Sequence, residues 1–274
     1  MTDPPEVDII VQEVLASAKY RAVSPELVRD LAARELGAGR RRKEAVKAVK
    51  NRLHQVAGAY FDARPDYEGW LAELRAAGGD RASLEAACRA IMGRHASTRE
   101  RLPILERFYA ETPAGLPPIR SVVDVACGLN PLALPWMPLA PGAAYYACDI
   151  YADLAGFLGR FFALAGVSGR AEVCDLVRGP PQQPADLALA LKVLPVLEQM
   201  DREAPLRLLR GLRAPYLLVS FPVHSLGGRG KGMPENYERR FRELTAGAGW
   251  EITRFAFPTE LAFLVAKPPG SLPS

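Results

Sequence analysis

The second half of the chain alternates between short apolar runs and stretches with helical periodicity. The apolar runs predict β-strands; they cover residues 121–126, 144–149, 171–174, 186–191 and 215–221. Helical stretches are predicted between them at residues 151–166 and 200–213. Short strands separated by helices predict a parallel, doubly wound α/β sheet. Two last runs, 251–257 and 260–266, flank Pro258 and predict an antiparallel hairpin.

The first half of the chain has helical patterns throughout. Residues 24–26 (Ser-Pro-Glu) supply a cap, a first-turn proline and a first-turn acid, which predict the start of a helix. Residues 41–60 form an amphipathic helix in this interpretation, with basic residues around an apolar stripe. The stripe consists of Val46, Val49, Leu53, Val56 and Tyr60. Further helices are predicted at 67–77, 82–95 and 97–110, the last opened by a capping box at residues 97–100 (Ser-Thr-Arg-Glu).

A proline- and glycine-rich segment at residues 112–118 separates the two patterns. Its prolines and glycine cannot continue a helix. We therefore expect a helical N-terminal domain over residues 1–112 and an α/β domain over residues 113–274.

Positive charge is concentrated near the N-terminus. Residues 19–52 hold eleven Lys and Arg against four acids, a net +7, whereas the whole chain is +4 and the remainder is therefore −3. Such a segment is either a solvated helix surface or a contact for phosphate, and its excess charge favours phosphate. The residues expected to bind RNA here are Arg40, Arg41, Arg42, Lys43, Lys47 and Lys50.

Cysteine and histidine spacing indicates neither a disulfide framework nor a metal site. The four cysteines, Cys88, Cys127, Cys148 and Cys174, are far apart and form no CxxC pair. The three histidines have no second His or Cys at ligand spacing. We expect reduced, mostly buried thiols and no bound metal.

The sequence gives no sign of membrane insertion or export. No apolar run approaches the roughly 18 residues of a membrane span, and the first residues carry acids at positions 3, 6 and 8 instead of a basic segment. We expect a cytoplasmic protein without membrane contact.

Three predicted strands end in residues suited to a nucleoside. The first leads into a glycine-containing turn at residues 124–131, which lets backbone approach a ligand. The second ends at Asp149, where a carboxylate can accept both ribose hydroxyls, and the third leads to Asp175, placed for an adenine amino group. A plain structural turn with surface acids is the alternative, but three such ends in series favour a nucleoside-containing cofactor.

The turn after the first strand distinguishes between cofactors. It has one glycine, Gly128, followed by Pro131, so it lacks the GxGxxG pattern and the helix N-terminus that hold a dinucleotide pyrophosphate. S-adenosylmethionine has no phosphate and fits this turn better than a nicotinamide cofactor.

Four segments carry a more specific resemblance. They are His95 to Arg101 (HASTRER), Ala126 to Ala133 (ACGLNPLA), Leu191 to Glu198 (LKVLPVLE) and Ser220 to Met233 (SFPVHSLGGRGKGM) with Asn236 and Tyr237. Through these four segments, the chain resembles the aminoglycoside-resistance 16S rRNA (guanine-1405, N7)-methyltransferases. The resemblance covers the chain from about Lys19 to Val265. The resemblance implies a Rossmann-like, S-adenosylmethionine-dependent methyltransferase domain preceded by an all-α domain that grips the 30S subunit.

The same resemblance implies the cofactor contacts. Arg101 would bind the methionine carboxylate, Asp149 the ribose, and Asp175 with Leu176 the adenine, while Tyr60 closes over the cofactor. The full expected set is Tyr60, His95, Ala96, Ser97, Arg101, Ala126, Gly128, Asp149, Ile150, Asp175, Leu176 and Leu191. Arg101 as an exposed helix arginine, His95 as a structural histidine and Tyr60 as a core residue are the alternatives.

The chemistry implied by the resemblance needs placement more than acid–base catalysis. Guanine N7 carries an in-plane lone pair and no proton, so it can attack a sulfonium methyl directly once the base is presented to it. We expect Lys192 and Glu198 to line the base pocket as catalytic groups, with Glu198 offsetting charge on the methylated purine and Lys192 contacting its carbonyl or a phosphate. Arg229 and Lys231, in the glycine-rich stretch 227–232, would contact RNA. A P-loop at this stretch is disfavoured because it lacks the GK[ST] ending.

The expected partner is 16S rRNA within the 30S subunit, bound by a monomer. Two other functions remain open from the sequence alone: a methyltransferase of another RNA, tRNA included, of a small molecule or of a protein, and a non-catalytic ribosome-binding factor.

Overall fold

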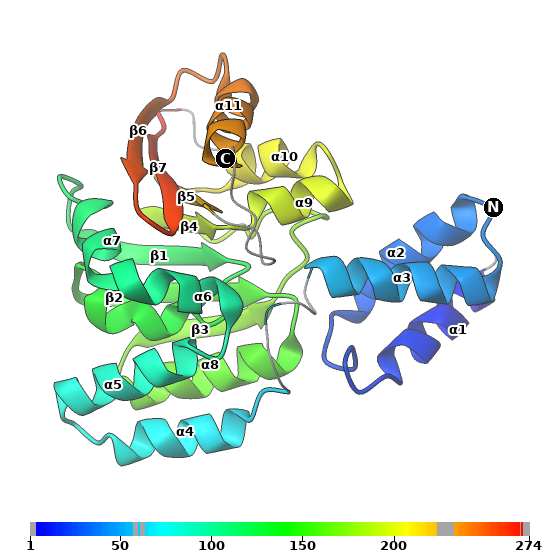
Figure 1. Cartoon of the computed structure of the whole chain (residues 1–274), viewed down its shortest axis with the longest axis horizontal. Coiled ribbons are helices and arrows are strands. Elements are labelled where there is room, and N and C mark those ends of the chain that lie inside the picture. The colour runs from blue at the N-terminus through cyan, green and yellow to red at the C-terminus, as the bar shows by residue number, and fades with distance from the viewer. Residues whose placement is uncertain (1–3, 57–59, 61–63, 224–232, 269, 271–274) are drawn as a thin grey trace.

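The computed structural model of the chain describes residues 4–56, 60, 64–223, 233–268 and 270. Seven strands form one sheet in the order β3-β2-β1-β4-β5-β7-β6 (Figure 1). The strands are β1 (Ile119–Val125), β2 (Leu139–Asp149), β3 (Ser168–Val173), β4 (Leu187–Leu191), β5 (Tyr216–Pro222), β6 (Glu251–Ala256) and β7 (Glu260–Ala266). All neighbours pair in parallel except β7, which is antiparallel to both β5 and β6. The predicted doubly wound sheet is confirmed.

The helices are α1 (Pro4–Leu15), α2 (Pro25–Gly37), α3 (Arg42–Val56), α4 (Tyr67–Ala76), α5 (Arg81–Met92), α6 (Ala96–Arg101), α7 (Leu105–Glu111), α8 (Ala152–Leu164), α9 (Leu194–Met200), α10 (Ala204–Gly211) and α11 (Met233–Thr245). Two 3₁₀ turns, η1 (Leu102–Ile104) and η2 (Asn130–Trp136), complete the set. Among the described residues, no helix is both long and apolar enough to cross a membrane.

Helices cover both faces of the sheet, as the alternation of apolar residues requires. On β1, Val122 belongs to the core shared with α4, α5, α7 and α8, whereas Val123 belongs to the core shared with α9, α10 and α11. The central strand β4 (Leu-Ala-Leu-Ala-Leu) is buried along its whole length because it is covered on both faces. Figure 1 shows the two helical layers above and below the sheet.

Helices α1, α2 and α3 form a separate lobe beside this body (Figure 1). They have a hydrophobic core of their own, to which the body contributes Met200 of α9. The lobe is tied to the tip of β2 by a bridge between Val23 and Tyr151 and by the Ser24 N–H, which donates to the carbonyl of Ile150 at 2.9 Å. The lobe therefore sits at the carboxyl ends of the parallel strands.

The hydrophobic cores divide the chain earlier than the domain boundary expected at residue 112. Helices α4, α5 and α7 contribute Trp70, Ile91 and Phe108 to the core beneath the sheet, where they pack with Phe157 of α8. These helices were expected in the N-terminal domain because they are helical. Burial instead groups them with the sheet, and the cores separate between α3 and α4.

Several local expectations are corrected. The helix expected at 97–110 is broken into α6, η1 and α7 at Pro103, and the capping box is absent: His95 precedes α6, while the hydroxyl of Thr98 donates to the Met92 carbonyl at 2.7 Å. Helices α1, α9 and α11 were not predicted.

The expectation of four reduced thiols is wrong for one pair. Cys148 on β2 and Cys174 directly after β3 form a disulfide, with Cα atoms 5.7 Å apart. Parallel pairing of β2 with β3 brings their carboxyl ends together, which the sequence separation of 26 residues does not reveal. Cys88 and Cys127 are free and buried.

Candidate functional site

A large pocket opens at the carboxyl ends of the parallel strands. It encloses about 1030 Å³, counting the part open to solvent, which is at the upper end of the range for sites that hold small molecules. Eleven of the twelve expected cofactor residues line it; Ala96 does not. The N-terminal lobe contributes Leu27 to its wall, and α9 contributes Met200.

The turn after β1 brings backbone close to this pocket. Ala126 and Gly128 both have a positive φ of 50°, a conformation that costs a side-chain-bearing residue free energy. The N–H of Gly128 donates to Oδ2 of Asp149 at 2.9 Å. The turn continues into the 3₁₀ segment η2 rather than an α-helix, so it offers no regular helix N-terminus for a pyrophosphate.

Asp149 is fixed by backbone donors on both oxygens. Besides the Gly128 N–H, the N–H of Ile150 donates to Oδ1 at 2.7 Å. Burial raises the pKa of this carboxyl, and the backbone donors oppose that shift. The carboxylate therefore has a single orientation at the tip of β2, where a vicinal diol can reach its remaining lone pairs.

Asp175 has one satisfied and one unsatisfied oxygen. Its Oδ1 accepts from the Val177 N–H at 2.9 Å, whereas Oδ2 is buried and has no hydrogen-bond partner among the described residues. Burial also raises the pKa of this carboxyl. An unsatisfied buried acceptor is costly unless a ligand supplies a donor, so this oxygen fits an exocyclic amino group such as that of adenine.

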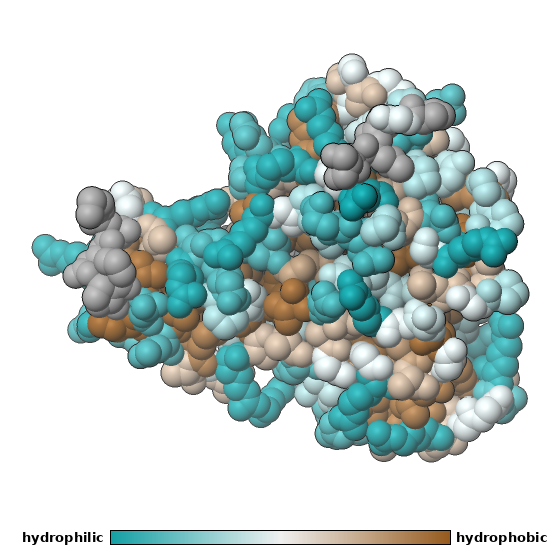
Figure 2. Space-filling view, turned by 180° about the vertical axis from the view of Figure 1, so that it is seen from behind, coloured by the Kyte–Doolittle hydropathy of each residue, from teal (hydrophilic) through white to brown (hydrophobic). Residues whose placement is uncertain are grey.

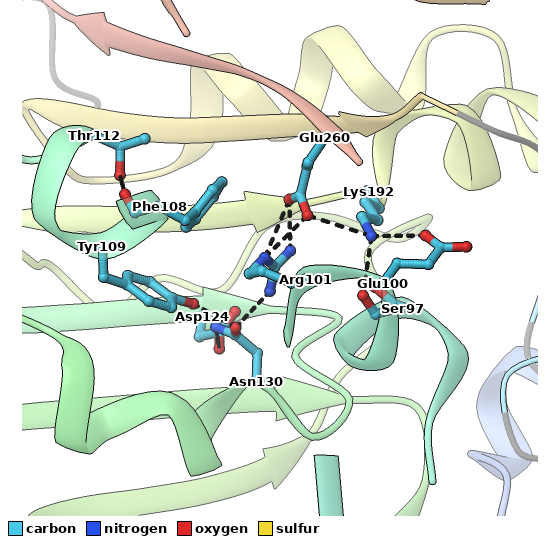
Figure 3. Close-up of polar contacts among 10 residues, drawn as sticks. All are labelled: Ser97, Glu100, Arg101, Phe108, Tyr109, Thr112, Asp124, Asn130, Lys192 and Glu260. Carbon is cyan, nitrogen blue, oxygen red and sulfur yellow. Dashed lines mark hydrogen bonds and ion pairs between the residues drawn. The ribbon is translucent and has the colours of Figure 1, made fainter. Parts of the chain in front are cut away.

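Arg101 lies at the end of the pocket near β7 and is 1% exposed (Figure 3). Its guanidinium donates to both oxygens of Glu260, at 2.6 Å from Nη2 and 3.1 Å from Nε, and to Oδ1 of Asn130 at 2.8 Å. The neighbouring carboxylate of Glu260 raises the pKa of Arg101 against the effect of burial. The alternative of an exposed helix arginine is therefore wrong.

Lys192 follows β4 and points into the same charged cluster (Figure 3). It has a positive φ of 59° and is 7% exposed. Its ammonium donates to the Ser97 carbonyl at 2.9 Å and to Glu100 at 2.8 Å, and it lies 3.3 Å from Glu260. Lys192 lines the main pocket as expected, but its cationic group is already paired within the protein.

Glu198 does not share that pocket with Lys192. It lies on the opposite side of α9, in a smaller hollow lined by Phe221 and Tyr237, and pairs with Arg240 at 2.7 Å. The expectation that both residues line one base pocket is therefore corrected: Lys192 precedes α9 and lines the main pocket, whereas Glu198 lies on the face of α9 that lines the smaller hollow.

Asp124, near the end of β1, is 1% exposed and lines the pocket. Its Oδ2 accepts from the Asn130 amide at 2.9 Å and from the Tyr145 hydroxyl at 2.7 Å. Burial raises its pKa to about 6 against these donors. Near neutral pH this group can change its charge inside the site.

His95 and Tyr60 form the wall on the side of the lobe. Their rings stack with centroids 5.4 Å apart, and the N–H of Ala96 donates to the Tyr60 carbonyl at 2.7 Å. Burial lowers the pKa of His95 to about 3, so its ring is neutral at physiological pH, and burial raises the pKa of Tyr60 to about 12. Both residues line the pocket, so Tyr60 is not simply part of a core.

The basic face expected to bind RNA lies on and before α3. Arg41, Lys43 and Lys47 are exposed, and within the described part of the chain no acid lies within ion-pair distance of their side chains. Arg40 pairs with the buried Glu35, and Arg42 lies 3.5 Å from Glu13. Lys50 is half-buried. Arg229 and Lys231 lie outside the described residues.

Two arginines of the lobe contact the C-terminal end of α9. Arg34 donates to the Met200 carbonyl at 3.2 Å and Arg52 to the Gln199 carbonyl at 3.0 Å. Cations at a helix C-terminus are favourable.

Figure 2 shows hydrophobic surface in the middle of the rear face, where the narrower lobe meets the body.

The site contains residues that sequence reasoning missed. Glu260 and Asn130 organise Arg101, and Glu260 and Glu100 organise Lys192; only Glu100 is a sequence neighbour of Arg101. Glu260 is 159 residues from Arg101, and only the antiparallel return of β7 beside β5 brings it there. An acid at the start of an otherwise apolar strand was the available signal.

The residues present fit S-adenosylmethionine. The unsatisfied oxygen of Asp175 suits an amino group, the fixed carboxylate of Asp149 suits a diol, and Arg101 retains N–H groups at the far end of the same pocket. The tips of the strands are open to a ligand and are not filled by side chains.

Comparison with known proteins gives consistent matches. A sequence model described as "Ribosomal RNA methyltransferase (FmrO)" matches residues 16–264. A 16S rRNA (guanine(1405)-N(7))-methyltransferase of Frankia casuarinae is 44% identical over 95% of this chain and 94% of its own length. One of Micromonospora echinospora is 38% identical over 97% of this chain and 99% of its own length.

Solved structures agree in fold. The crystal structure of the 16S rRNA methyltransferase RmtF in complex with S-adenosyl-L-homocysteine matches with a TM-score of 0.83 and 34% identity, covering 98% of this chain and all of that one. The 16S rRNA methylase RmtB matches with a TM-score of 0.78 and 32% identity, over 97% of this chain and all of that one.

Proposed function

Because this chain belongs to the ribosomal RNA methyltransferase (FmrO) family, we infer that the pocket at its strand tips is the site from which a methyl group reaches the RNA. The protein is an S-adenosylmethionine-dependent 16S rRNA (guanine-1405, N7)-methyltransferase of the aminoglycoside-resistance family. The observation that supports this use of the pocket is that Asp175 after β3, Asp149 at the end of the neighbouring strand β2 and Arg101 of α6 line one cavity.

We assign the residues as follows. Asp149 holds the ribose, and Asp175 beside Leu176 receives the adenine amino group on its unsatisfied Oδ2. Arg101 binds the methionine carboxylate through the N–H groups that Glu260 and Asn130 leave free. His95 and Tyr60 close the pocket on the side of the lobe.

The reaction requires little proton chemistry from the protein. Bound S-adenosylmethionine supplies a methyl group on a positively charged sulfur, which a neutral nucleophile can attack directly. Guanine N7 needs no base, so the chain's contribution is placement and exclusion of water. Lys192 and Val193, which follow β4 and line the pocket, are the residues we place nearest the incoming base. Lys192 is held there by Ser97 and Glu100.

The N-terminal lobe docks the pocket onto the 30S subunit in this proposal. The exposed cations on and before α3, Arg41, Lys43 and Lys47, which pair with no acid among the described residues, contact phosphates. The hydrogen bonds of Arg34 and Arg52 to α9 hold the lobe against the pocket. We propose that the protein acts as a monomer in the cytoplasm, where its ribosomal substrate is found.

Drug susceptibility of an expressing strain tests the assignment in cells. Methylation of guanine-1405 predicts resistance to kanamycin and gentamicin together with sensitivity to apramycin. A strain expressing Asp149→Ala at the same level is the control and is expected to stay sensitive to all three. Resistance to apramycin, or no resistance at all with soluble wild-type protein, contradicts the assignment.

A further inference from the structure

Glu260 stands behind the charged end of the pocket. It is the first residue of β7, is 0% exposed and is not part of the pocket wall, whereas Arg101 and Lys192 both are. Its carboxylate receives two N–H groups of Arg101, and its Oε2 lies 3.3 Å from the ammonium of Lys192 (Figure 3). One buried acid therefore contacts both cations that face the cavity.

Stability alone is a weak reason for such an arrangement. Taking an arginine, a lysine and a glutamate out of water costs free energy that their attraction barely repays, and apolar side chains of the same volume often serve a fold equally well. Among the described residues, Glu260 is the ion-pair partner of Arg101, while Lys192 has Glu100 as a second partner. Removing Glu260 therefore affects the orientation of Arg101 most.

The hydrogen bonds of Arg101 leave a defined remainder. A guanidinium has five N–H groups. Two are donated to Glu260 and one to Asn130, so two remain, in fixed positions because the group is planar and is held on two sides. A planar ligand carboxylate at the pocket can use these two without displacing any protein contact.

We propose that Glu260 is the positioning residue for the amino-acid end of the cofactor: by holding Arg101 and Lys192 from behind, it fixes the donors that recognise the ligand carboxylate. This inference rests on the cofactor role assigned to Arg101 above. It predicts that loss of Glu260 affects ligands with an amino-acid end and spares those without one.

Two ligands separate positioning from general structure. S-adenosylhomocysteine carries the amino-acid end, whereas 5′-methylthioadenosine keeps the adenine, ribose and thioether but lacks it. In isothermal titration calorimetry, Glu260→Gln lowers the affinity for S-adenosylhomocysteine by about tenfold or more, the effect of losing well-placed charge-assisted hydrogen bonds. Affinity for 5′-methylthioadenosine stays within about twofold of wild type.

Glu238→Gln is the matched control. Glu238 also holds two arginines, Arg242 and Arg254, but lies on α11 away from the pocket. This variant keeps wild-type affinity for both ligands. Glu260→Asp keeps the negative charge but moves it back by one methylene, so it shows the same selective loss of affinity for S-adenosylhomocysteine to a smaller extent. This second variant provides the test if Glu260→Gln does not fold.

The outcomes distinguish the positioning role of Glu260 from the cofactor-binding role of Arg101. An equal loss for both ligands, or unchanged affinity for S-adenosylhomocysteine in a folded Glu260 variant, overturns the positioning role. Arg101→Ala, measured beside it, reports on the underlying assignment: a selective loss there with none in Glu260→Gln refutes this inference alone. Absence of a selective loss in Arg101→Ala removes the assigned role of Arg101 itself.

Discussion

The imidazole of His95 packs so closely on Gly128 that a Cβ atom at residue 128 would lie 2.9 Å from its Cε1. The ring is buried, stacks on Tyr60 and precedes α6, so it has little room to move. Gly128 also has a positive φ, and its N–H orients Asp149. One backbone position thus couples the helical wall of the pocket to the acid at the tip of β2.

Gly128→Ala is expected to damage cofactor binding. The substitution meets the His95 ring and places a side chain in the left-handed region, which costs about 1–2 kcal/mol by itself. Affinity for S-adenosylhomocysteine, measured by calorimetry, falls by about tenfold or more because the turn and Asp149 shift together. Gly159→Ala, on the exposed side of α8 with open space around it, is the control and leaves affinity unchanged. Wild-type affinity in Gly128→Ala contradicts this reading of the turn.

Asp124 predicts an unusual dependence of stability on pH. Burial raises its pKa to about 6 in the folded protein, above the unfolded value near 3.8, so the folded state binds the extra proton and stability falls as pH rises from about 4 through 6. Asp124→Asn removes this term and can keep the bonds from Asn130 and Tyr145 on its amide oxygen.

Urea denaturation of wild type and Asp124→Asn at several pH values measures this term. Relative to the wild type, the free energy of unfolding of Asp124→Asn rises by up to about 3 kcal/mol between pH 4 and pH 8, with the smallest difference at pH 4. Other titrating groups cancel in the difference. A constant difference across this range, or one that grows toward acid, refutes the raised pKa.

The Cys148–Cys174 disulfide predicts a redox-dependent stability. Closing a loop of 26 residues restricts the unfolded chain and stabilises the protein by about 3 kcal/mol. Urea denaturation with and without dithiothreitol measures the loss, and Cys148→Ser with Cys174→Ser loses the dependence on reductant. Cys88→Ser retains it, since that thiol is free. Quantitative alkylation of Cys148 and Cys174 in native protein kept without reductant contradicts the disulfide.

The exposed cations near α3 predict weaker binding to the ribosomal subunit when they are removed. Combined replacement of Arg41, Lys43 and Lys47 by alanine reduces the affinity for 30S subunits. Each lost phosphate contact also makes the negative slope of log K against log salt concentration shallower by about 1. Affinity for S-adenosylhomocysteine is unchanged. Arg107→Ala, on α7 and paired with Glu111, is the control. Equal 30S affinity and salt slope in the triple variant contradict phosphate contact by this face.

The strands were predictable because their signal is local. Each predicted run ends at a turn or a helix, and two acids, Asp149 at the end of β2 and Asp175 after β3, take their places from the strand ends alone. Helix α9 was missed because it has only seven residues and begins at Leu194, two residues after Lys192 with its positive φ. Local patterns too short for periodicity give no signal.

Long-range partners were not predictable in the same way. Glu260 and the Cys148–Cys174 pair depend on which strands become neighbours, and the separation of α3 from α4 depends on which core each helix faces. The motif resemblance located Arg101, but its burial against Glu260 follows only from the sheet order.

Methyl transfer to intact 30S subunits measures the activity of the protein directly. Purified protein, subunits and labelled S-adenosylmethionine are combined, and the modified nucleotide is located by mass spectrometry of 16S rRNA fragments. We expect a single methyl group on N7 of guanine-1405, lost in Arg101→Ala with the fold intact. No transfer to 30S subunits, or transfer to a different nucleotide such as adenine-1408, would contradict this expectation.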